Sequence, residues 1–289
     1  MTEPNIMQPE FEPLIDQLAS IDSRLQRLEK LSGRVVSTLE QSRRTGSLQV
    51  QSEYFQKITQ HQLSDLETLQ AVADKGLSLA RFGDGEMSLA TDPLRGIYFQ
   101  KGSFELSRSL RNVISEPRKN LLVTFPIASN GREAISVIAK FWGILRNVVS
   151  EGQVWGSTGV SRPNCFKRHG EMAVEAWTRC WEGRDVTIVT GQGSRFDLID
   201  PLFTGVKPRY LFGPPVNAFE DIDKIRDAIL AEERDLVLLS LGPAATVLAA
   251  ELADEGIQAL DVGHLSASYD AVFRGGEKPD RRPVVNDGN

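Results

Sequence analysis

The sequence predicts an α/β protein: a Rossmann-like, mainly parallel sheet sandwiched by helices and preceded by an N-terminal coiled-coil helix. Short, continuous apolar runs alternate with helical patterns, which is typical of a parallel sheet that helices cover on both faces. Upstream of these runs, apolar residues recur every seven positions. Of the 289 residues, 40% are hydrophobic and 25% are charged, which is close to the globular average and excludes wholesale disorder.

The segment 14–44 is predicted to form the coiled coil. Seven of eight seam positions are apolar in two interleaved seven-residue series: Leu14, Ile21, Leu28 and Val35, and Leu18, Leu25, Ser32 and Leu39. A narrow stripe of this kind is typical of helices that self-associate, so we expect a homo-oligomer. The alternative is one amphipathic helix packed on its own domain. Residues 1–13 and 275–289 are expected to be disordered, and the polar segment 45–60 is expected to be a linker.

The remaining segment, residues 61–274, is predicted to form one enzyme-sized domain. Its first helix begins with a capping box of Ser64 and Glu67 and ends at Gly76. Six apolar runs then predict strands, at residues 77–82, 121–125, 185–190, 209–213, 235–241 and 257–262. Helical patterns lie between them, at residues 105–115, 131–148 (behind an Asn130 and Glu133 capping box), 171–181, 217–232 and 244–255.

Composition excludes several classes of protein and of site. Lys and Arg number 33 against 39 Asp and Glu, and a net charge of -6 argues against a general nucleic-acid binder. Two cysteines and three scattered histidines exclude a disulfide scaffold and a Cys or His metal cage. The chain starts without an apolar signal segment and has no apolar run long enough to span a bilayer. We therefore expect a cytoplasmic protein with no membrane span.

The densest cluster of reactive residues is RFGDGEM, residues 81–87, directly after the first predicted strand. In an extended segment, residues two apart point the same way, so Asp84 and Glu86 are expected to project to one side. Gly83 and Gly85 leave room for a ligand to approach closely. Two such carboxylates suit Mn²⁺ or Mg²⁺, which take oxygen ligands. The alternative is an ordinary acidic turn at the end of a strand.

Four further segments could meet an anionic ligand, because ligands bind where strand ends face helix N-termini. Gly242 and Thr246 lie in a tight turn that starts a helix, and Arg195 ends the glycine turn GQGSR. Arg162 begins the basic stretch SRPNCFKRHG, and His264 follows the last strand. For each segment, the alternative is an ordinary loop, a solvated charge or a structural histidine.

Five segments together resemble the glycosyltransferases of the GT-D fold. They are RFGDGE (81–86), SRP (161–163), WEGRDVTIV (181–189), SR (194–195) and LGPAATVLAAELADEGIQALDVGH (241–264), and the resemblance covers about residues 62–273. It implies transfer of a sugar from a nucleotide diphosphate sugar, with Asp84 and Glu86 as the metal-binding pair. The family usually carries acidic residues where this chain has Thr190 and Gln192, so no acid–base role is assigned to that turn.

The sequence thus predicts a metal-dependent hexosyltransferase that acts on an acceptor hydroxyl of a glycan or glycoprotein. The predicted catalytic residues are Asp84, Glu86 and His264, and the predicted substrate-binding residues are Arg81, Gly83, Arg162, Arg195, Gly242 and Thr246. A cation and arginines would stabilise the negative charge on the departing diphosphate. The base for the acceptor stays open among Asp197, Asp261, His264 and a carboxylate near the metal. Two alternatives are a non-catalytic nucleotide-sugar or phosphate-binding module assembled through its coil, and another phosphate-handling enzyme such as a phosphatase.

Overall fold

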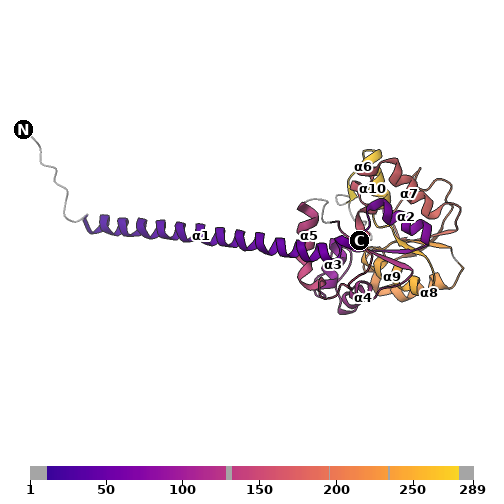
Figure 1. Ribbon diagram of the computed structural model, residues 1–289, viewed down its shortest axis with the longest axis horizontal. Helices are drawn as coiled ribbons and strands as arrows, with labels where there is room; N and C mark the ends of the chain where they lie inside the picture. Colours follow the sequence, from indigo (N-terminus) through magenta and orange to yellow (C-terminus); the bar gives the residue numbers. More distant parts are fainter. Residues whose placement is uncertain (1–11, 128–131, 195, 234, 280–289) are drawn as a thin grey trace, which may run out of the picture. The chain divides into compact units, whose positions relative to one another are not determined.

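A computed structural model describes residues 12–127, 132–194, 196–233 and 235–279 (Figure 1). By its internal contacts the chain divides into an N-terminal unit, Met1–Gln49, and a compact unit, Val50–Asn289. Most of the two ends predicted to be disordered, residues 1–13 and 275–289, falls outside the described residues, but residues 12 and 13 lie in a helix. Within the part of the tail that is described, the backbone N–H of Gly276 donates to the carbonyl of Asp270.

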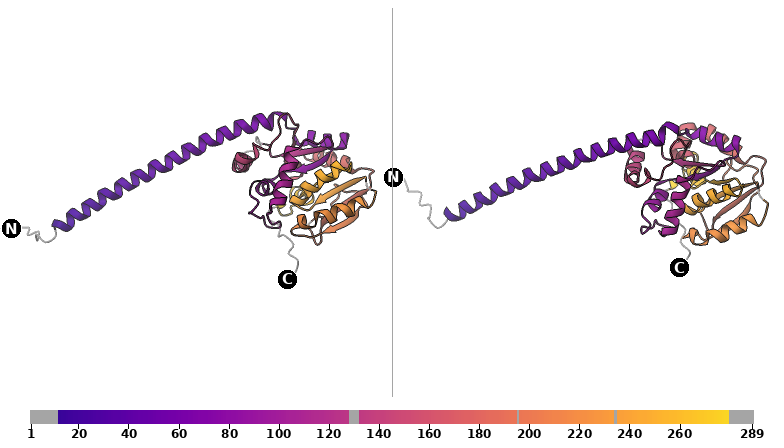
Figure 2. Two further views of the ribbon diagram at one scale, coloured as in Figure 1. Left: turned by 90° about the horizontal axis from the view of Figure 1, so that it is seen from below. Right: turned by 60° about the horizontal axis from the view of Figure 1, so that its bottom comes forward.

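The first helix, α1, runs from Glu12 to Lys57 and is continuous in both further views (Figure 2). The linker predicted over residues 45–60 is therefore wrong, because the helix continues through that segment. Its continuation has a physical reason: Tyr54 and, just beyond the helix, Ile58 are buried in the core of the compact unit. Upstream, the described apolar side chains of the stripe are 51 to 62% exposed, namely Leu18, Ile21, Leu25, Leu28 and Val35. Their association with a second helix stays a prediction.

The compact unit contains a seven-stranded parallel sheet in the order β3-β2-β1-β7-β6-β4-β5. This confirms the predicted fold class and the six predicted strands. A seventh strand, β3, has only two residues at one sheet edge, too few to form an apolar run. The strands are β1 Ser78–Arg81, β2 Leu121–Phe125, β3 Gly156–Ser157, β4 Val186–Gly191, β5 Arg209–Gly213, β6 Leu236–Ser240 and β7 Ala259–Asp261.

Helices cover both faces of the sheet, and in β1, β2, β4, β6 and β7 neighbouring residues point into two separate cores. In β1, for example, Ala80 packs in one core and Leu79 in the other. The first core holds α3 Asp84–Thr91, α4 Phe104–Ser115, α5 Arg132–Leu145, α8 Ile222–Leu230 and α9 Pro243–Asp254. The second holds α2 Asp65–Lys75, α6 Pro163–His169, α7 Glu171–Trp181 and α10 Leu265–Phe273, and the two groups lie on opposite sides of the strands in Figure 1.

The position of the site follows from where the chain changes face. Strands β1 and β7 are neighbours, with Leu79 paired to Leu260. The chain leaves β1 into α3 on one face and leaves β7 into α10 on the other. Such a switch point opens a crevice at the carboxyl ends of the two strands, where open α/β sheets bind their ligands.

Cys165 and Cys180 are buried, free thiols, and burial raises the pKa of both, that of Cys180 to about 12. Neither thiol is therefore a nucleophile at neutral pH.

Among the described helices, none is both long and apolar enough to cross a membrane.

Candidate active site

The floor of the crevice is an ion pair between the last residues of its two strands. Arg81 ends β1 and Asp261 ends β7, and both are buried. Nε of Arg81 lies 3.4 Å from Oδ1 of Asp261, and Nη1 of Arg81 donates to Oγ of Ser161. Because the carboxyl ends of adjacent parallel strands meet at one edge, this pair joins segments from opposite ends of the domain.

Two neighbours complete the packing of this pair. Gly263 has a φ of +48°, and a Cβ at that position would overlap the guanidinium of Arg81. Oγ1 of Thr246 lies 3.0 Å from the carbonyl oxygen of Arg81 and 3.2 Å from Oδ2 of Asp261. Thr246 was predicted to bind substrate, but its side chain is fully buried and binds the protein instead. Arg81 was also predicted to bind the ligand, but its guanidinium instead pairs with Asp261 in the floor of the crevice.

The acidic segment after β1 is not extended. Helix α3 begins at Asp84, with Gly83 as its N-cap, and the Glu86 carboxylate turns back to accept the N–H of Gly83 at 2.9 Å. Residues two apart on a helix point in nearly opposite directions. The prediction that both carboxylates project to one side of an extended strand is therefore wrong: Asp84 is exposed at the crevice, whereas Glu86 is half-buried beneath it.

Burial and charge change the proton affinity of the half-buried carboxyl. Burial and, to a smaller extent, the nearby charge of Asp261 raise the pKa of Glu86 to about 7, while hydrogen bonds from backbone N–H groups and the charge of Arg81 act in the opposite direction. Burial also raises the pKa of Asp261, against the lowering effect of Arg81 and the Thr246 hydroxyl. A carboxyl whose pKa is near 7 can give or take a proton at physiological pH, which is a frequent property of active-site groups.

The acidic residues at the start of α3 fit a metal ion only in part. Within the described ranges, no three His, Cys, Asp or Glu side chains are grouped as a metal cage. Asp84 offers an exposed carboxylate, and one oxygen of Glu86 is already engaged by the N–H of Gly83. Such a donor set fits Mg²⁺ or Mn²⁺, which take few protein carboxylates and complete their shell with water and substrate phosphates.

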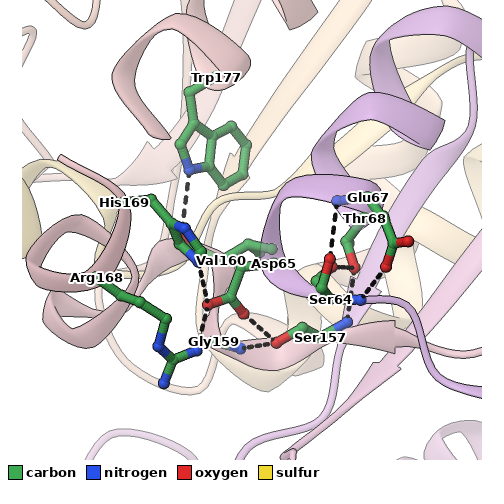
Figure 3. A network of polar contacts seen from close by, with 10 residues as sticks. All are labelled: Ser64, Asp65, Glu67, Thr68, Ser157, Gly159, Val160, Arg168, His169 and Trp177. Carbon is green, nitrogen blue, oxygen red and sulfur yellow. Dashed lines mark hydrogen bonds and ion pairs between the residues drawn. The ribbon is translucent and has the colours of Figure 1, made fainter. Parts of the chain in front are cut away.

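A buried network of polar contacts (Figure 3) holds the segment 157–162, which includes the Ser161 that contacts Arg81. Asp65, 2% exposed, accepts a hydrogen bond from Ser157 at 2.5 Å and one from Arg168 at 3.1 Å. Nε2 of His169 lies 3.5 Å from the same carboxylate, and Ser157 Oγ accepts the N–H of Gly159. The network thus ties α2 and α6 to the segment 157–162.

That segment carries two residues of the site. Ser161 contacts Arg81 at the floor, and half-buried Arg162 is the N-cap of α6. Sequence analysis grouped Arg168 and His169 with Arg162 in one basic patch. The structure separates them, because Arg168 and His169 lie beside Asp65 (Figure 3).

His264 is half-buried at the N-terminus of α10, and Gly242, with a φ of +57°, is the N-cap of α9. Both follow strands of the sheet at the edge where Gly83 and Asp84 lie. Arg195 is outside the described residues.

The segment 92–103, which packs against the site, was not predicted from the sequence. The side chain of Ile97 lies against Gly85, and that of Phe99 lies against Gly242. Between them, Tyr98 is 90% exposed. Two adjacent aromatic residues in the glycine-flanked stretch GIYFQKG were the available signal.

Comparisons with known proteins show the family of this chain. The chain matches the family described as Glycosyltransferase GT-D fold over residues 79–282. It is 32% identical over 222 residues to a probable glycosyl transferase Gly of Streptococcus gordonii, covering 72% of this chain and 32% of that protein. It is also 32% identical over 225 residues to the glycosyltransferase GlyD of Streptococcus pneumoniae serotype 4, covering 72% and 27%. The chain thus spans about a third or less of the length of these relatives.

Solved structures show the same likeness. A new glycosyltransferase (DUF1792) from Streptococcus sanguinis superposes with a TM-score of 0.67 at 31% identity, over 74% of this chain and 85% of that one. A structure of the highly conserved domain of unknown function 1792, described as having a distinct glycosyltransferase fold, superposes with a TM-score of 0.69 at 28% identity. That match covers 81% of this chain and 87% of the other.

Proposed function

The chain belongs to the glycosyltransferase GT-D fold family, and on that premise we propose that it moves a sugar from a nucleotide diphosphate sugar to an acceptor hydroxyl with the help of a divalent cation. The observation that carries the proposal is the start of α3. There Asp84 is exposed at the crevice between β1 and β7, and Glu86 is half-buried beneath it. The acceptor is a hydroxyl of a glycan or glycoprotein.

Each residue at the crevice has a part in binding the donor. Asp84 and Glu86 would hold Mn²⁺ or Mg²⁺, and this ion, when bound, supplies positive charge to the leaving diphosphate. Arg162 adds a guanidinium that can meet a phosphate through two donors. Gly83 and Gly242 are the N-caps of α3 and α9, and the first backbone N–H groups of these helices can donate to phosphate oxygens.

The acceptor hydroxyl requires a base, and burial narrows the choice. Asp261 is buried and paired with Arg81, so it is a poor candidate to reach a substrate. Asp197 is exposed on the loop after β4, with its carbonyl accepting a hydrogen bond from Ser266 of α10. We assign the base to His264, because a half-buried imidazole at the crevice edge is the more common proton acceptor in enzymes.

The N-terminal helix serves assembly in this proposal. Its exposed apolar stripe would be buried if α1 paired with a second copy of itself. Light scattering on the full chain and on a chain beginning at Val50 tests this. We expect a dimer or larger oligomer from the full chain and a monomer from the shorter one. Two monomers would contradict the pairing.

Donor hydrolysis tests the proposed chemistry. A panel of nucleotide diphosphate sugars is incubated with the full chain, with and without Mn²⁺, and release of nucleoside diphosphate is measured. We expect release from at least one donor, dependent on the cation. Release that is unaffected by a chelator would contradict the metal, and binding of a donor without any release would favour a non-catalytic module.

A further inference from the structure

A small hairpin closes one side of the crevice. The backbone N–H of Ile97 donates to the carbonyl of Gln100 at 2.8 Å, and the N–H of Gln100 donates back at 3.2 Å. Tyr98 and Phe99 therefore form a two-residue tip. The side chains of Ile97 and Phe99 pack against the protein. Ile97 lies on Gly85, between the two acidic residues of α3, and Phe99 lies on Gly242 at the start of α9. We refer to residues 97–100 as the 97–100 hairpin.

The 97–100 hairpin is anchored to the segment before α8. Asn217 donates its N–H to the carbonyl of Phe99 at 2.8 Å, and its Oδ1 accepts the N–H of Lys101 at 2.9 Å. Buried Gln100 accepts the N–H of Phe219 through its side chain at 3.2 Å. Asn217 has a φ of +56°, a left-handed conformation that short polar residues adopt more readily than most. These bonds hold the hairpin in one place.

Its tip presents an aromatic ring to solvent. Tyr98 is 90% exposed, so its ring adds little buried apolar area to the fold. Its neighbours Ile97 and Phe99 account for the packing of the hairpin, and the ring of Tyr98 does not. An exposed aromatic side chain on a fixed backbone loses little entropy when it binds, which suits it to contact a ligand ring.

The exposure also indicates which substrate the ring would contact. Binding sites bury most of the surface of a small ligand, so the donor is expected to lie inside the crevice. An acceptor glycan is larger and must extend out of the crevice past its edge. A ring that is 90% exposed at that edge fits the acceptor better than the donor.

We propose that Tyr98, presented by the 97–100 hairpin, is a stacking platform for a sugar ring of the acceptor. This inference rests on the proposed function, because it assumes that the crevice transfers sugar. It assigns acceptor affinity to a residue that has no part in holding the cation or the diphosphate. The hydroxyl of Tyr98 is not needed for stacking, whereas the ring is.

The test compares Tyr98→Ala and Tyr98→Phe with Met172→Ala, which removes an exposed apolar side chain from α7 on the opposite face of the sheet. Acceptor probes are methyl glycosides of glucose, galactose and N-acetylglucosamine, and binding is read by saturation-transfer NMR, which needs no turnover. For the glycoside that binds, we expect Tyr98→Ala to weaken affinity about five- to tenfold. Tyr98→Phe and Met172→Ala should keep the wild-type affinity.

Donor hydrolysis in water, measured on the same proteins, separates this inference from the proposed function. We expect all three variants to hydrolyse donor with the wild-type KM and rate. A raised donor KM with unchanged glycoside binding would assign the ring to the donor and overturn the proposal. Three other results would also overturn it. They are a Tyr98→Ala variant that binds the glycoside as tightly as the wild type, a Tyr98→Phe variant that no longer binds it, and a wild type that binds none of the glycosides. A wild-type protein that hydrolyses no donor would instead count against the proposed function.

Discussion

The floor and the rim of the crevice contain similar residues with opposite surroundings. On the floor, Arg81 and Asp261 are buried and paired with each other, and Glu86 turns in towards them. On the rim, Asp84 is exposed and Arg162 is half-buried. Residue type alone therefore does not distinguish a residue that stabilises the fold from one that can contact a ligand. The burial of the side chain does distinguish them, and the predicted effects of substitution differ accordingly.

The largest effect is expected on the floor. Asp261→Ala leaves the buried guanidinium of Arg81 without its carboxylate, and breaking a buried pair from one side lowers the free energy of unfolding by about 3 to 5 kcal/mol. Asp254→Ala is the control, since Asp254 pairs with Arg118 at the surface and should lose less than about 1 kcal/mol. Urea unfolding measures both. Equal losses of unfolding free energy in the two variants would contradict the difference between the buried pair and the surface pair.

The pH dependence of stability follows from Glu86. Its pKa in the folded protein, about 7, lies above the ordinary 4.5, so the folded state binds the proton more tightly than the unfolded chain. Its contribution to stability is complete below about pH 4.5 and is lost as the pH rises through 7. Glu86→Gln, which stays neutral, should therefore gain about 2 to 3 kcal/mol relative to wild type between pH 4.5 and 8.

Urea unfolding at several pH values measures this gain. Glu105→Gln, which changes an exposed acidic residue in the first turn of α4, should show no comparable gain. A difference between Glu86→Gln and wild type that does not vary with pH would contradict the burial of this carboxyl.

On the rim, Arg162→Ala should weaken donor binding and leave stability nearly unchanged. A charge-assisted contact with a phosphate is worth about 2 kcal/mol, or roughly thirtyfold in affinity. Arg162→Lys should recover only part of it, because an ammonium lacks the planar fork. Calorimetry with the nucleoside diphosphate measures the affinity. Unchanged affinity in Arg162→Ala would remove this residue from the site.

The smallest effect concerns Asp65, which acts on the rim through other residues. Asp65→Asn keeps a partner for Ser157 but loses the charge that faces Arg168, so the segment 157–162 should hold Arg162 less firmly. We expect donor affinity to fall about three- to tenfold, or roughly 1 kcal/mol. Asp74→Asn is the matched control, because Asp74 pairs with Arg179 at the exposed end of the same helix. Donor affinity that falls equally in both variants would contradict a specific role for Asp65.

Local pattern was sufficient for most of the fold. Buried parallel strands are continuous apolar runs, and each of the six predicted strands is present. The linker was mispredicted because Tyr54 and Ile58 pack on residues distant in sequence, a stabilisation that a polar composition does not reveal. The pairing of Arg81 with Asp261 depends on β1 and β7 being neighbours, which no local pattern contains.

The site was predicted by residue but not by geometry. The place of Asp84 and Glu86 directly after a strand favoured an extended segment, whereas Glu86 three positions after Gly83 was a signal for a helix start. That signal would have separated the two carboxylates. The 97–100 hairpin could not be placed from sequence, because its contacts with Gly85 and Gly242 arise only in the folded chain.

The central claim is that the exposed carboxylate at the start of α3 holds the cation. The most direct measurement is a Mn²⁺ titration of Asp84→Asn in the presence of nucleoside diphosphate, with Glu105→Gln, in the first turn of α4, as the matched control. The account predicts that Asp84→Asn melts like the wild type, loses Mn²⁺ affinity strongly and turns over at least about a hundredfold more slowly, while the control is unchanged. A folded Asp84→Asn protein with wild-type Mn²⁺ affinity would contradict the account.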